Sequence, residues 1–312
     1  MKLLTPETIV QQRASARCES ANADFSAIDL NRPFIHEHYT QLYHTGVYAE
    51  LNYRQRLRYN QLYGMRTNEQ FMLFESGFTQ RVMSRLLKSC DTDDSGTLRQ
   101  CLNILLQEEQ RHYTMFHTLN KLSMPGVYSR RPYHFLRVSR LEQLVLGVAC
   151  HYPRQLLSLL WLVLLMEEHA VRFSRNMMKD KRTDNLGDLE SNFLLAHRLH
   201  LQDETGHVHI DANIIDFVLD RSSHRTRKLN VRLLKHLLRA TLKPRRAGIN
   251  VIKQLIGEHP QLQSHAGRME NCIRALDFDP CLMPLLQDCS QRPVTTALLE
   301  MYPEFERALV IQ

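Results

Sequence analysis

Apolar residues are spaced helically along most of this chain. They recur three and four residues apart rather than every second residue, which is the period of an α-helix with one buried face. The segment 155–178 is apolar almost all round at its start, so we expect it to lie centrally. The pattern predicts long helices over residues 59–87, 98–119 and 155–178, another long one after residue 189, and a shorter one over 138–149.

The same pattern predicts further helices towards both ends of the chain. Thr5 and Pro6 form a typical helix start, and residues 24–35 show no helical period, so we expect an extended arm there. No stretch has the composition of a linker. We therefore predict an all-α protein with a single domain over 1–312, in which further helical segments lie near 45–53, 227–242, 248–257 and 264–276, before a proline-punctuated tail.

Composition narrows the class of protein. The longest apolar stretch without a charge, 155–166, has 12 residues, whereas a membrane-spanning helix needs roughly 20. The chain begins without the apolar run of a secretory signal, so we expect a cytoplasmic protein without a membrane span. Seven cysteines without a Cys-x-x-Cys pair predict neither a disulfide framework nor an iron–sulfur site. Electrons for any redox reaction must then come from an external donor.

The positive charge is concentrated in one segment. The net charge is +7, but residues 221–246 hold ten Lys or Arg and no acid, which leaves −3 for the rest. Nucleic acid, an acidic membrane surface or an acidic protein are possible partners of such a segment. We favour an amphipathic helix with a solvated basic face and no nucleic-acid function, packed on the protein through Leu229, Leu233, Leu234 and Leu237.

Two short motifs carry the spacing of metal ligands. His200, Glu204 and His207 lie four and then three residues apart, so on a helix they share one stripe. Glu109 and His112 repeat the Glu-x-x-His part. In ferritin-like di-iron bundles, two helices each provide a Glu-x-x-His and two others each provide a lone Glu. The chain should therefore contain two lone glutamates inside apolar helical faces.

Both lone glutamates can be assigned by position. Glu75 lies in the middle of an apolar stripe, where a carboxylate is costly unless it is paired or bound to metal. On the helix 155–178 the apolar residues average closer to the direction of Glu167 than to that of Glu168, so Glu167 is preferred and Glu168 is the alternative. Glu75 precedes Glu109 by 34 residues and Glu167 precedes Glu204 by 37. This duplication predicts two helical hairpins in a ferritin-like four-helix bundle, with additional N- and C-terminal helices.

The donor set selects the metal. Two divalent ions balance four glutamates, whereas an empty site buries unpaired charge. Carboxylates mixed with imidazoles suit iron or manganese, and two adjacent ferrous ions can supply two electrons to dioxygen. Glu108 and Asp203 each precede a ligand glutamate, so we expect them to accept hydrogen bonds from the ligand histidines of the opposite hairpin.

One competing metal signal is weak. Residues 91–96 imitate the beginning of an EF-hand calcium loop, but position twelve is Leu102 where a bidentate Glu is needed. We expect an interhelix turn there.

The complete motif set, Glu75, Glu109-x-x-His112, Glu167 and His200-x-x-x-Glu204-x-x-His207, resembles the di-iron N-oxygenases of the p-aminobenzoate N-oxygenase and arylamine oxygenase type. The resemblance covers residues 59–217, and 221–312 would be accessory helices. It implies seven iron ligands, namely Glu75, Glu109, His112, Glu167, His200, Glu204 and His207. Glu108 departs from the family, which usually has Asp there.

The resemblance also implies an activity. We expect an N-oxygenase that converts an amine to hydroxylamine, nitroso or nitro products with two iron ions, dioxygen and an external electron donor. The amine is a free small molecule or carrier-bound in a biosynthetic pathway, the donor is a protein or a small reductant, and the enzyme is a homodimer. The alternatives are a C–H hydroxylase or desaturase on the same core, and a metal-storage or radical-bearing subunit. Apolar residues expected to line the substrate pocket include Phe78, Leu105, Val163 and Phe173.

Overall fold

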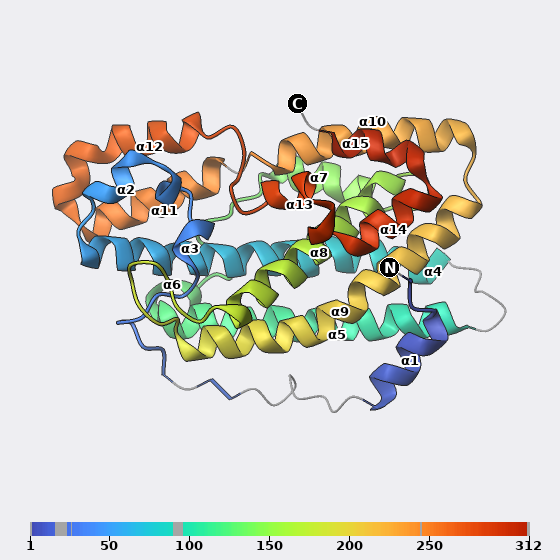
Figure 1. Cartoon of the computed structure of the whole chain (residues 1–312), viewed down its shortest axis with the longest axis horizontal. Helices are drawn as coiled ribbons and strands as arrows, with labels where there is room; N and C mark the ends of the chain where they lie inside the picture. The colour runs from blue at the N-terminus through green and yellow to red at the C-terminus, as the bar shows by residue number, and fades with distance from the viewer. Residues whose placement is uncertain (1, 16–23, 26, 90–95, 244, 311–312) are drawn as a thin grey trace.

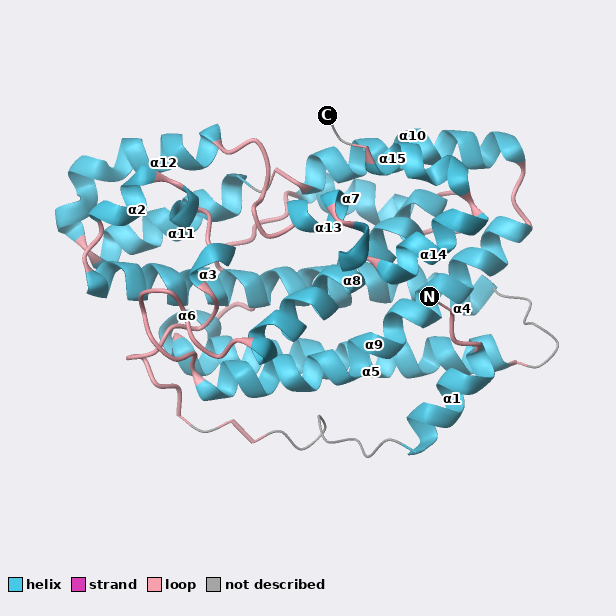
Figure 2. Ribbon diagram, in the orientation of Figure 1, coloured by secondary structure: helices cyan, strands magenta, loops and turns pink. Residues whose placement is uncertain are grey.

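Helices make up almost all the regular structure. The computed structural model describes residues 2–15, 24–25, 27–89, 96–243 and 245–310. Within these ranges the only β-type contact is an isolated bridge between Arg182 and Asp188, so the all-α prediction is confirmed (Figure 2). In the same part of the chain, no helix combines the length and apolarity that a membrane crossing requires.

Two helical hairpins form the centre of the fold. The first joins α3 (Tyr53–Phe74), a π-helical turn (Glu75–Thr79) and α4 (Gln80–Ser89) to α5 (Thr97–Ser123). The second joins α8 (Leu157–Lys179) to α9 (Ser191–Asp220). Helix α3 packs on α5, α5 on α9 and α9 on α8 (Figure 1). The predicted ferritin-like four-helix bundle is therefore present.

The first rod differs in detail from the predicted helix 59–87. It begins earlier because Asn52 forms a capping box: its side chain accepts the Gln55 N–H at 3.0 Å, and Gln55 Oε1 accepts the Asn52 N–H at 3.0 Å. A π-helical turn starts at Glu75 and interrupts the α-helix. Such turns add a residue to one helical turn and are frequent at functional sites. Periodicity alone does not reveal this one.

Shorter helices surround the bundle, as expected. Residues 90–95, where the interhelix turn was predicted, lie outside the described part of the chain. On the N-terminal side and between the hairpins are α1 (Pro6–Ser15), α2 (Gly46–Glu50), α6 (Pro125–Tyr128) and α7 (Arg140–Ala149). Beyond the bundle are α10 (His224–Thr241), α11 (Arg245–Glu258), α12 (Ala266–Ala275), α13 (Met283–Gln287), α14 (Pro293–Met301) and α15 (Glu306–Leu309).

The packing face of α10 differs by part of a turn from the prediction. Leu234 is buried as expected, but Leu229 is 54% exposed. The buried side chains are Asn230, Leu234 and Leu238, which are spaced by four. Asn230 accepts the Ser158 N–H at 2.9 Å and donates to the Gln155 carbonyl at 2.7 Å. Asn230, and not the predicted Leu229, therefore lies at the contact with α8, where its side chain binds backbone groups at the start of that helix.

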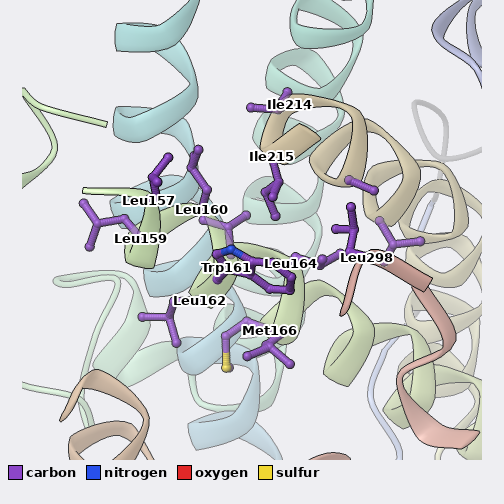
Figure 3. Packing of buried hydrophobic residues seen from close by; sticks show 14 of the residues in the cluster. Leu157, Leu159, Leu160, Trp161, Leu162, Leu164, Met166, Ile214, Ile215 and Leu298 are labelled. Atoms are coloured by element: carbon purple, nitrogen blue, oxygen red, sulfur yellow. The ribbon is translucent and has the colours of Figure 1, made fainter. Parts of the chain in front are cut away.

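The apolar core consists of two clusters separated along the bundle. One contains Phe71, Phe116, Phe173 and Phe193 from one half of the four rods. The other includes Trp161 among the leucines and isoleucines shown in Figure 3. Trp161 stacks on Phe305 with ring centroids 4.9 Å apart. The predicted ligands fall between the two clusters in every rod. Each cluster therefore closes one end of the region in which the polar groups lie.

Close packing at Gly64 ties α3 to the preceding arm. A Cβ atom at Gly64 would lie 2.7 Å from Phe34 Cβ. Phe34 is fully buried and stacks on Phe193 with ring centroids 4.0 Å apart, so it has little room to move.

We expect Gly64→Ala to lower the free energy of unfolding by about 1–3 kcal/mol, because overpacking forces neighbours out of position. Gly147→Ala in α7 is the matched control, since nothing lies within 4 Å of its Cβ position. It should leave stability unchanged or raise it. Urea titrations followed by circular dichroism measure both, and equal midpoints for the two variants would contradict the prediction.

Candidate metal centre

Carboxylates and imidazoles from the four rods converge between the two apolar clusters. The donor atoms of six of these side chains form two groups, in each of which all atoms lie within 4.8 Å of one another, and Glu167 of α8 belongs to neither group. His112 and Glu204 belong to both. The first group is Glu75, His112, His200 and Glu204, and the second is Glu109, His112, Glu204 and His207; each of these side chains is at most 1% exposed.

The shared residues lie at the middle of the cluster. Glu204 Oε1 is 3.2 Å from His112 Nδ1, 3.1 Å from His200 Nε2 and 3.1 Å from His207 Nδ1. His200 Nε2 is also 3.0 Å from Glu75 Oε1. His200 therefore faces the cluster through Nε2, whereas the two histidines of the Glu-x-x-His motifs face it through Nδ1.

The outward nitrogens of these two histidines are held by carboxylates of the opposite hairpin. His112 Nε2 lies 3.1 Å from Asp203 Oδ2, and His207 Nε2 lies 2.9 Å from Glu108 Oε2. An Nε2–H donated to a carboxylate leaves Nδ1 as the lone-pair donor that a metal requires. Glu108 and Asp203 thus lie where the sequence predicts, and the longer side chain of Glu108 reaches its histidine.

Two arginines surround this pair of acids. Arg111 Nη2 is 3.3 Å from Glu108 Oε1 and 3.5 Å from Asp203 Oδ2. Arg13 of α1 is 3.1 Å from Asp203 Oδ1 and also donates to the Asp203 carbonyl. Burial raises the pKa of Asp203, but the hydrogen bond and charge of His112, together with His207 and Arg13, outweigh it and hold this pKa at about 2. Asp203 is therefore a carboxylate at neutral pH.

Glu167 and Glu168 point to different places. Glu167 is 1% exposed and its Oε1 has no hydrogen-bond partner within the described ranges; burial, and then the charges of Glu204 and Glu109, hold its pKa well above the usual range. Glu168 instead accepts the backbone N–H of Val294 at 2.6 Å. It also accepts that of Thr295, so it caps the N-terminus of α14.

The cluster fits metal ions because its central atoms are not satisfied by protein. Within the described ranges, the carboxylate oxygens of Glu109 and Glu204 have no hydrogen-bond partner of suitable geometry. The same holds for Nδ1 of His112 and His207, and for one oxygen each of Glu75 and Glu167. Buried polar atoms are normally paired, so this concentration of orphaned donors marks a place for cations. Burial and the charge of Glu75 raise the pKa of Glu109 to about 7, as expected for anions crowded without counter-ions.

The structure also contains site residues that the sequence reasoning missed. Asp211 is fully buried and neither of its oxygens has a hydrogen-bond partner within the described ranges. It continues the stripe of His200, Glu204 and His207 by one more turn, which was the available signal. Arg13 gave no signal, because it lies in a separate helix far away in sequence.

A cavity lies beside the rod that carries Glu75, although none of the predicted ligands is among its lining residues. Its volume is about 720 Å³, and Phe74, Gly77 and Phe78, which flank Glu75 along the chain, line it together with Met166 and Arg66. Of the residues expected to line a pocket, Phe78 does so. Leu105, Val163 and Phe173 do not line this cavity, because their side chains pack within the apolar clusters.

Comparison with known proteins places the chain among oxygenases. A family model described as "P-aminobenzoate N-oxygenase AurF" matches residues 20–248, more than two thirds of the chain. No curated protein matches it. The matched range contains both hairpins and every predicted ligand.

We expect Glu167→Gln to lower the metal content after reconstitution with ferrous ion, because an amide cannot replace an anionic ligand. Glu168→Gln is the matched control. It should keep the metal content but lose about 1 kcal/mol of stability through the weakened helix cap. Elemental analysis and urea unfolding of both variants measure these effects, and a metal loss confined to Glu168→Gln would reverse the assignment.

Metal should stabilise the protein, and the metal-free cluster should be a source of instability. At ion concentrations one hundred times Kd, binding raises the free energy of unfolding by about 2.7 kcal/mol. Glu109→Leu should abolish this gain yet make the metal-free protein more stable, since it removes an unpaired buried carboxylate. Melting temperatures with chelator and with ferrous or manganous ion test both statements. A wild-type Tm that does not respond to either ion would exclude a metal centre here.

Proposed function

The chain belongs to the p-aminobenzoate N-oxygenase family, and on that premise we propose that it is a di-iron oxygenase that transfers oxygen from dioxygen to the nitrogen of an amine. The products would be a hydroxylamine, a nitroso or a nitro compound. One observation carries the proposal: six buried carboxylates and imidazoles converge from three of the four rods, and most of their central atoms have no hydrogen-bond partner within the described ranges.

Each ligand has a proposed task. Glu75, Glu109, Glu167 and Glu204 with His112, His200 and His207 would hold two iron ions, which when bound supply electrons and open coordination positions for dioxygen activation. Manganese fits the same donors. Asp203 and Glu108 fix the rings of His112 and His207 through their Nε2–H groups, and Arg111 and Arg13 form ion pairs with these two acids.

The surroundings suit a reaction that must exclude water. The ligand side chains are almost completely buried, and an apolar cluster closes the bundle on either side of them. Electrostatic interactions are stronger in such a region, and reactive species are protected from hydrolysis. The two clusters thus contribute to the chemistry by insulating the site as well as stabilising the fold.

The cavity lined by Phe74, Gly77 and Phe78 is the proposed substrate site. Leu73, Phe74 and Phe78 supply apolar and aromatic surface for the body of the amine. Arg66 lines the same cavity and is 3% exposed; its Nη2 lies 4.0 Å from Asp279 Oδ2, and its Nε atom has no hydrogen-bond partner within the described ranges. A buried guanidinium favours a carboxylate or phosphate group. We therefore propose an amine that combines an apolar body with an anionic group, either free or attached to a carrier.

Both chain ends contribute to the central region, which supports the proposal of one domain. Arg13 of α1 contacts Asp203, and Glu168 of α8 caps α14. Electrons would come from an external protein or small reductant, because the cysteines offer no Cys-x-x-Cys pair. A homodimer and a cytoplasmic location complete the proposal.

We expect ferrous-loaded protein, exposed to ¹⁸O-labelled dioxygen and a reductant with p-aminobenzoate as the probe amine, to place the label on nitrogen. Mass spectrometry of the products measures this. Glu109→Gln should lose the reaction, whereas Glu168→Gln should retain it. Label found on carbon would favour a hydroxylase or desaturase on the same core.

A non-oxygenase function is the other alternative. A storage protein would take up iron far beyond two ions per chain, and a radical subunit would give a stable tyrosyl signal in electron paramagnetic resonance. His200 argues against both, because it adds a third imidazole to the two that the paired Glu-x-x-His motifs supply in ferritin-like di-iron bundles.

A further inference from the structure

Helix α7 carries an apolar face that no described part of the chain covers. None of its ten residues is buried. Leu141, Leu144, Val145 and Val148 are 70%, 65%, 60% and 56% exposed. Their spacing of three, one and three residues places them on one side of the helix. Contiguous exposed apolar surface of this kind usually marks an interaction site.

The N-terminus of α7 is capped. Ser139 Oγ accepts the Glu142 N–H at 3.2 Å, and Glu142 Oε2 accepts the Ser139 N–H at 2.7 Å, which completes a capping box. The outward apolar face is therefore part of a defined element. Tyr152, 55% exposed, follows the same helix.

A stripe of cations runs along the solvent side of α10. It lies opposite the buried Asn230, Leu234 and Leu238. In the described part of the chain, none of its members forms an ion pair with a carboxylate. The members are Arg225, Lys228, Arg232, Arg239 and Lys243, all of them exposed.

The apolar face and the cationic stripe belong to neighbouring elements. Arg246, just beyond α10, lies 3.8 Å from Glu142 of α7. Gln143 and Leu146 of α7 line the same cavity as Leu237 and Thr241 of α10. Each helix turns one side to this cavity and the opposite side to solvent. The apolar face and the cationic stripe thus lie on the outer sides of two helices that border one cavity, and the Arg246–Glu142 pair links the end of the basic segment to α7.

We propose that these outer sides of α7 and α10 dock the protein on an anionic lipid membrane. The aliphatic side chains of α7 enter the boundary between headgroups and acyl chains, and the cations of α10 bind lipid phosphates. A helix with an apolar face bordered by Lys and Arg has the chemistry of an interfacial helix, and each basic residue adds attraction to anionic lipids. Tyr152 fits the headgroup level, where aromatic residues are enriched. The cavity would then open towards the lipid phase.

Charge and composition favour lipid over a protein occupant. A second copy of the chain on the same surface would bring one cationic stripe against another, which repels. An acidic protein would satisfy the cations, but protein interfaces favour aromatic anchors and hydrogen-bonding groups. The stripe Leu141, Leu144, Val145 and Val148 offers only aliphatic carbon. A lipid surface needs no specific partner geometry and satisfies both features.

The test is co-sedimentation of the metal-loaded full chain with vesicles. We expect binding to phosphatidylcholine mixed with phosphatidylglycerol, no binding to phosphatidylcholine alone, and release by added salt. Lys228→Glu with Arg232→Glu should weaken partitioning by about five-fold for each cation lost. Arg54→Glu with Lys121→Glu, which makes the same charge change elsewhere on the surface, should weaken it much less.

The contribution of α7 is measured separately. Leu144→Gln with Val148→Gln should lower vesicle binding, whereas Leu30→Gln with Met301→Gln, at positions 50% and 52% exposed, should not. Hydrogen exchange of the α7 amides should slow when vesicles are added. Three results would each overturn the proposal: no binding of the wild-type chain to anionic vesicles, equal losses in test and control variants, or slowed α7 exchange that depends on protein concentration without lipid. Binding to an acidic protein with no affinity for vesicles would likewise replace lipid as the occupant.

Discussion

The structure depends on the need to satisfy buried carboxylates and imidazoles at one place in an apolar bundle. Glu75, Glu109, Glu167 and Glu204 lie where a lone charge costs several kcal/mol, and protein atoms leave much of their hydrogen-bonding capacity unused. Two cations resolve this conflict in electrostatic terms. The division of the core into two apolar clusters follows, because no apolar side chain can fill the intervening layer. The same layer gives the protein its proposed chemistry, since a fold that needs metal for charge balance also holds that metal away from water.

Around this layer, residues without any predicted metal contact determine how the ligands are presented. Asp203 and Glu108 each fix a histidine of the other hairpin, so each hairpin orients a ligand of its partner. Arg111 and Arg13 in turn neutralise these acids. The arrangement has approximate two-fold character, which agrees with the duplicated spacing of the motifs. His200 breaks that symmetry, because it faces the cluster through Nε2 while the other two histidines use Nδ1. A site of two unequal halves suits a reaction in which dioxygen and an amine approach from one side.

In the proposed reaction, α7 and α10 border the side of the bundle from which the substrate would approach. Both helices border the cavity that Phe74, Gly77 and Phe78 line, and each exposes a chemically distinct face to solvent. The apolar face of α7 is left uncovered although the rest of the chain packs closely, as Gly64 against Phe34 illustrates. The buried metal layer therefore contrasts with the loosely covered surface at α7, where the proposed substrate cavity lies. Substrate access and surface docking would share that surface, while the chemistry stays deep in the bundle.

Local periodicity determined much of this protein. The 3.6-residue pattern specified the four rods, and the spacing of Glu and His residues along them specified which side chains face one point, because helical geometry converts a difference of three or four residues into a shared direction. It also favoured Glu167 over Glu168. Only the tertiary structure decided the contacts made across long sequence separations. Arg13 meets Asp203 across 190 residues, and Glu168 caps α14 across 126. Tertiary packing also decided the π-helical turn at Glu75, the burial of Asn230 and the exposure of Leu229. These features depend on where neighbouring helices pack, which the periodicity of the sequence does not encode.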